Sequence, residues 1–106
     1  MRKRTFRITM QVPIGERYGT MSWEEENGSL FGVLEIMEHQ NPFTGRITSG
    51  DGSGPEKTVA LAGKMVTPVR EIPYTAEGYV TGGRITLQLQ EPRHTYFIEG
   101  TEDGHA

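Results

Sequence analysis

The sequence predicts an all-β protein, an antiparallel up-and-down meander that closes into a barrel of about eight strands. Three features of the chain predict it. Apolar and polar residues alternate in one segment after another, turn residues separate the segments, and nowhere does a helical period extend over the roughly ten residues that a parallel crossover needs. Because the connections are short, segments that follow one another in the chain are expected to pair in space.

The first two strands are expected at residues 5–12, "TFRITMQV", and 18–25, "YGTMSWEE". In the first strand every second residue is apolar, which is typical of a strand with one buried face. These residues are Phe6, Ile8, Met10 and Val12. Met21 and Trp23 continue the pattern in the second strand.

A hairpin is expected at Asn27-Gly28, because a type I′ turn prefers two such residues with positive φ. The return strand is then "SLFGVLEIMEH", residues 29–39. An alternative stays open: Ser22 and Glu25 match a helix capping box, and Gly28 would end that helix early.

The middle of the chain carries the strongest turn signals. Asn41-Pro42, with Gly45 close behind, predicts a turn at "HQNPFTG", followed by a short strand at 43–49. Segment 50–56, "GDGSGPE", is expected to be a flexible loop. Four alternating segments follow, joined by "TPV", "TGG" and "EPR": "KTVALAGKMV", "REIPYTAEGYV", "RITLQLQ" and "HTYFIEGT". The 106 residues are therefore expected to form one domain, 1–106, with a loose tail at 102–106.

Glycines interrupt the strands in a consistent phase. Six of them are in step with the apolar residues of their own strands and are expected to point inward: Gly19, Gly32, Gly45, Gly63, Gly78 and Gly100. In a closed sheet the strands coil tightly, and small inward residues relieve crowding or permit the bend. Closure also removes the exposed edges that an open meander would carry.

The segments "YGTMSW", "NGSLFGVLE", "LAGKM" and "EGYVTGGRITLQL" are similar to the glycine-punctuated strands of the avidin and streptavidin family and, more loosely, of lipocalin-type barrels. The resemblance covers most of the chain and implies a small calycin-type barrel, and we expect a bacterial group of proteins with this fold. Trp23 is the only tryptophan, so the resemblance implies a fold and no particular ligand.

The inward positions are almost wholly apolar, and a barrel of this size either fills its interior with side chains or holds one small ligand. Trp23, Tyr74 and Tyr96 combine an apolar body with a polar tip, so they are the candidate ligand-binding residues. The alternative is that they pack the core. The expected inward set is Phe6, Ile8, Met10, Val12, Met21, Trp23, Leu30, Leu34, Ile36, Phe43, Ile47, Val59, Leu61, Met65, Ile72, Tyr74, Val80, Ile85, Leu87, Leu89, Tyr96 and Ile98.

Composition argues against several partners. The net charge is −3, and the basic start "MRKRTFR" is interpreted as a solvated end, so no nucleic-acid partner is expected. There is no cysteine, and no apolar run approaches the ~20 residues that span a bilayer. We expect no membrane contact and a cytoplasmic location.

Catalytic and metal-binding patterns are weak. His39, His94 and His105 lack the spacing of metal ligands, so no metal or other cofactor is expected. No serine lies in a nucleophile-elbow pattern, and the acidic run 24–26 is interpreted as a solvated strand end. An enzyme in which Tyr74, Tyr96 or Glu25 moves a proton at the barrel mouth stays open as the alternative.

Several apolar residues fall on the outward phase: Phe31, Val33, Met37, Val66, Tyr79 and Phe97. If they cluster, the wall is an interface, and a homo-oligomer is expected. The sequence thus favours a non-enzymatic barrel that binds a small apolar or aromatic molecule in its lumen or associates with itself through its wall. A purely structural module with a filled core is a further alternative.

Overall fold

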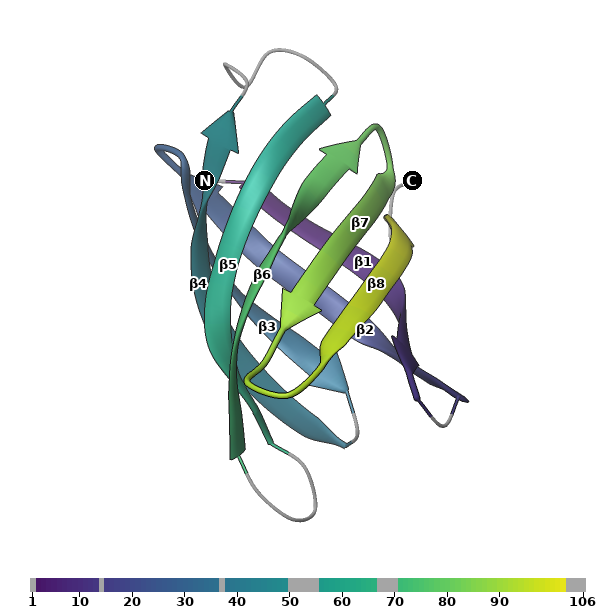
Figure 1. Cartoon of the computed structure of the whole chain (residues 1–106). Coiled ribbons are helices and arrows are strands. Elements are labelled where there is room, and N and C mark those ends of the chain that lie inside the picture. Colours follow the sequence, from purple (N-terminus) through teal and green to yellow (C-terminus); the bar gives the residue numbers. More distant parts are fainter. Residues whose placement is uncertain (1, 14, 37, 50–55, 67–70, 103–106) are drawn as a thin grey trace.

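The computed structural model describes residues 2–13, 15–36, 38–49, 56–66 and 71–102. Within these ranges the chain forms eight strands and no helix, which confirms the all-β prediction (Figure 1). The strands are β1 (Arg2–Val12), β2 (Gly15–Glu26), β3 (Ser29–Ile36), β4 (His39–Ser49), β5 (Glu56–Val66), β6 (Glu71–Thr81), β7 (Arg84–Gln90) and β8 (Thr95–Glu102).

The meander closes on itself. Each strand pairs antiparallel with the next, and β1 pairs with β8 from Phe6 opposite Glu102 to Gln11 opposite Phe97. Followed from strand to strand, the ladder that starts at Lys3 runs through Glu24, Phe31, Thr44, Ala62, Thr75, Gln90 and Thr95. Extending the β1–β8 register two residues beyond Gln11 aligns Thr95 with position 13, so one circuit advances the register from position 3 to position 13. A stagger of about ten residues tilts the strands by roughly 35–45° and closes a narrow barrel.

The turns define two ends of the barrel. Asn27 and Gly28 have φ of 53° and 83°, as a type I′ hairpin requires, and Ser22 and Glu25 lie within β2, which excludes the helix alternative. This turn and the β6–β7 turn at Gly82 lie at the same end of the barrel as the start of β1 and the end of β8 (Figure 1).

The predicted turn at residues 39–45 is wrong, because β4 already begins at His39. The chain reverses between Ile36 and His39, and Glu38 there has a φ of 65°. Pro42 has no N–H to donate to a neighbouring strand. It is tolerated inside β4 because at this position β4 pairs only with Val33 of β3, and pairing with β5 begins one residue later, at Phe43.

Asn41 belongs to the same strand rather than to a turn, and its side chain is fully buried. Its amide nitrogen donates to the carbonyl oxygen of Leu34 at 2.9 Å, and its amide oxygen accepts from the backbone N–H of Val66 at 2.8 Å. The side chain therefore links β3 to β5 where the ladder between β4 and β5 has ended.

The expected inward set is confirmed as the core. Nearly all of its members are buried in one cluster, and Val12, Ile47 and Tyr96 pack against that cluster while partly exposed. Phe6 and Trp23 are in ring contact, with centroids 5.1 Å apart. The protein's own side chains therefore occupy much of the interior.

The six in-phase glycines lie where neighbouring strands approach closely. At each of them, the atom nearest to an added Cβ would be a carbonyl oxygen of the adjacent strand. At Gly32 the Cβ would also lie 2.7 Å from Cζ of Phe43 and 2.8 Å from Cβ of Trp23. These glycines therefore allow close approach of the neighbouring strand's backbone, and Gly32 also relieves crowding by side chains.

Positions 50–55 and 103–106, which carry most of the expected loop and tail, lie outside the described residues. Glu56 and Glu102 differ from expectation, because they belong to β5 and β8. The described part of the chain contains no helix long and apolar enough to cross a membrane.

Candidate functional site

Four charged side chains come together inside one end of the barrel: Arg4, Glu25, Lys57 and Glu102. We call this the charged end. Arg4 and Lys57 are only 6% and 7% exposed. They point inward because each continues the alternation of its strand, Arg4 in step with Phe6 and Lys57 in step with Val59.

The first ion pair links β1 to β8, the two strands whose pairing closes the barrel. Arg4 donates from Nη2 to Oε1 of Glu102 at 2.8 Å and from Nε to Oε2 at 3.0 Å, so the contact is bidentate. Nη2 also donates to the carbonyl oxygen of Gly82 at 3.0 Å, and the guanidinium lies 5.2 Å from the ring centroid of Phe6. The hydrogen bonds to Glu102 raise the pKa of Arg4, although burial opposes them.

The second ion pair links strands that are not neighbours in the sheet. Lys57 of β5 donates from Nζ to Oε1 of Glu25 in β2 at 3.1 Å, and Trp23 donates from Nε1 to Oε2 of the same carboxylate at 3.0 Å. Burial alone would raise the pKa of Glu25, but the bonds from Trp23 and Lys57, with the positive charges of Lys57 and Arg4, leave the pKa below its usual 4.5. Glu25 is therefore held as a carboxylate.

Two sequence interpretations are corrected here. Arg4 was expected in a solvated basic end and Glu25 in a solvated acidic run, yet both point into the barrel. The physical reason is the pleat, since a charged residue in step with apolar neighbours faces inward whatever its type. Lys57 and Glu102 were missed altogether, and the same phase rule would have found them.

The three candidate ligand-binding residues do not converge. Trp23 lies near the charged end, where β2 finishes, whereas Tyr74 and Tyr96 lie near the starts of β6 and β8 at the opposite end. Tyr74 is 4% exposed, and its hydroxyl is buried without a hydrogen-bond partner in the described structure. Burial raises the pKa of Tyr74 to about 12. Tyr96 is partly exposed, with its ring centroid 6.0 Å from that of His94.

Within the described ranges no three His, Asp or Glu residues gather as metal ligands would. His39 begins β4 and His94 precedes β8, while His105 lies outside the described residues.

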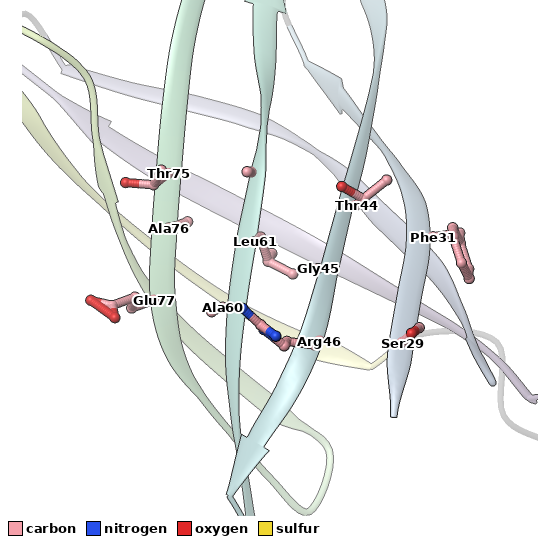
Figure 2. Close-up of a pocket in the computed structure, with 11 residues that line it drawn as sticks. Ser29, Phe31, Thr44, Gly45, Arg46, Ala60, Leu61, Thr75, Ala76 and Glu77 are labelled. Atoms are coloured by element: carbon pink, nitrogen blue, oxygen red, sulfur yellow. The ribbon is translucent and has the colours of Figure 1, made fainter. Parts of the chain in front are cut away.

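The outer wall carries two shallow grooves of about 710 and 800 Å³. The first crosses β3 to β6 and includes Phe31 (Figure 2). The second crosses β7, β8, β1 and β2 and includes Tyr18, which is 70% exposed and was not among the expected outward residues.

The expected outward apolar residues are spread around the wall. Phe31, Tyr79 and Phe97 are 54%, 48% and 53% exposed, but they lie on β3, β6 and β8, with at least one strand between each pair. Val33 and Val66 are partly exposed, and Met37 lies outside the described residues. These side chains therefore do not form one continuous apolar patch.

No known family model, no curated protein and no solved structure matches this chain. The closed eight-stranded antiparallel barrel is compatible with a calycin-like fold.

The pairing of Glu25 predicts a specific acid dependence. Because the pKa of Glu25 is lower in the folded protein than its usual 4.5, the ion pair contributes stability above about pH 4.5 and loses it as the pH falls through the folded-state pKa. We expect wild type to be more stable than Glu25→Gln at pH 7 and this difference to shrink towards pH 3, measured by urea unfolding.

The matched control is Glu24→Gln, since Glu24 is exposed on the adjacent position of the same strand. The free energy of unfolding of Glu24→Gln should stay close to that of wild type from pH 7 to pH 3. A difference between wild type and Glu25→Gln that does not change with pH would contradict the assignment.

Proposed function

We propose that this protein is a non-enzymatic β-barrel that acts through its outer wall, by association with a second copy of itself. The observation that carries the proposal is the groove across β3 to β6. It is lined by half-exposed Phe31, by small and polar residues of the outer face, and by the buried Leu61. Small side chains on a sheet surface let a second sheet approach to the usual spacing of about 10 Å.

The packed interior leaves the outer wall as the larger surface available for binding. The core cluster places large apolar side chains along the lumen, among them Phe6, Trp23, Met21 and Leu87. At the charged end, carboxylates and cations bind one another, which is the arrangement expected of a barrel end closed by its own side chains. Glu25 and Tyr74 lie toward opposite ends, so they do not share a site for proton transfer.

Association is tested by sedimentation velocity from about 1 to 500 µM chain, a range that covers weak and moderate dimers. We expect the mass to rise from the 11.8 kDa of one chain to twice that value. The rise should occur without any change in the far-UV spectrum. A mass of one chain throughout the range would overturn the proposal.

A second candidate function is favoured by one observation. The buried hydroxyl of Tyr74 has no partner in the described structure, and a small apolar or aromatic molecule with one acceptor would satisfy it. A thermal-shift panel of such molecules, with Trp23 fluorescence as a second readout, tests this candidate. A flat response in both readouts for wild type would remove it.

A further inference from the structure

The outward residues of the first groove form two rows that run across β3, β4, β5 and β6. One row is Phe31, Thr44, Ala62 and Thr75, and the other is Ser29, Arg46, Ala60 and Glu77. In both rows the residue on β5 is an alanine with a polar or charged residue on each side, on β4 and β6, so the surface is lowest along β5. We call this surface the alanine face. Figure 2 shows Arg46 and Glu77 on either side of Ala60.

The flanks of the alanine face carry opposite charges. Arg46 and Glu77 are both exposed, and within the described residues neither has an ion-pair partner. Their strands lie on either side of β5, so their Cα atoms are about 10 Å apart at the usual strand spacing of ~4.8 Å.

We infer that the alanine face is the interface of a twofold dimer whose axis runs parallel to β5, above Ala60 and Ala62. This inference rests on the proposed self-association and specifies its geometry. A twofold axis in this direction exchanges the two flanks, so Arg46 faces the partner's Glu77 and Thr44 faces the partner's Thr75. Each contact occurs twice, and the alanines of the two copies meet at the centre.

The physical fit of this arrangement is good. Packed sheets lie about 10 Å apart, and alanine against alanine permits that distance or less. A twofold axis parallel to β5 sets the two β5 strands parallel, within the roughly 30° range of aligned sheet packing, and the long side chains of Arg46 and Glu77 reach across the gap on either side. Strands β4, β5 and β6 of each copy meet at this interface, and because buried area does not by itself set affinity, sedimentation velocity over the full concentration range measures the dissociation constant.

The second groove holds both cations and carboxylates, but they lie in different rows. One of its rows is Thr20, Arg7, Thr101 and Arg84, which contains two cations and no carboxylate. A twofold axis along this wall therefore pairs no opposite charges within the row. This contrast makes the second groove the control surface.

Charge reversal tests the inference. Arg46→Glu sets two carboxylates against each other at both ends of the interface, and Glu77→Arg sets two cations against each other, so each variant alone should weaken the dimer at least tenfold. The double variant and an equimolar mixture of the two single variants both restore opposite charges at both contacts. Each should dimerise within about threefold of wild type.

Arg84→Glu is the matched control, because it makes the same change at an exposed arginine of the second groove. It should dimerise as wild type does, and thermal unfolding should show that every variant is folded. If wild type dimerises but Arg46→Glu does not weaken it, or the mixture fails to recover, the alanine face is overturned while self-association stands. If wild type stays monomeric, both fail.

Discussion

Replacing Gly78 with alanine is expected to lower the free energy of unfolding by about 3 kcal/mol or more, the upper part of the range for overpacked sites. An added Cβ would press on the carbonyl oxygen of Thr86 and lie 2.8 Å from Cα of Leu87. Both atoms belong to the backbone of β7, so no side chain can turn away to make room. The two strands would have to separate where β6 and β7 coil together.

Gly83→Ala is the matched control, because a Cβ there would meet only Cβ of Glu102, at 3.8 Å. Its free energy of unfolding should stay within about 0.5 kcal/mol of wild type. Urea unfolding followed by Trp23 fluorescence measures both variants. A Gly78→Ala protein as stable as Gly83→Ala would show that the wall tolerates a methyl group at this approach.

The phase of these glycines was readable in the sequence because a strand alternates with a period of two. The same alternation predicted the core, since apolar residues such as Phe6, Leu34 and Leu87 occupy the inward positions of their strands almost without exception. It did not predict which atoms the glycines avoid. The carbonyl of Thr86 reaches Gly78 only in the observed register, which the two-residue turn between Thr81 and Arg84 fixes.

The charged end was missed for a different reason. Arg4 and Glu25 were assigned to solvent by residue type, although their phase placed them inward. Their partners could not be found from the sequence, because Lys57 is 32 residues from Glu25 and Glu102 is 98 residues from Arg4. The prediction of a turn at Asn41-Pro42 was wrong for a similar reason. The buried amide of Asn41 bonds to β3 and β5, and the sequence does not show these long-range partners.

Lys57→Met is expected to lower the free energy of unfolding by about 2–4 kcal/mol, because it leaves Glu25 ionised and largely buried with Trp23 as its remaining donor. Loss of one partner from a buried pair costs more than loss of both. Adding Glu25→Gln to the same chain removes the stranded charge, so the double variant should recover most of the stability. Urea unfolding of the four members of this cycle at pH 7 measures the coupling.

The control for Lys57→Met lies on the same strand. Lys64 is exposed on the outer face of β5, so Lys64→Met makes the same chemical change without a buried partner and should cost less than about 0.5 kcal/mol. If Lys57→Met costs no more than Lys64→Met, the ion pair is a solvated surface contact and does not close the barrel. If the double variant is no more stable than Lys57→Met alone, the loss comes from packing of the lysine stem, not from the stranded carboxylate.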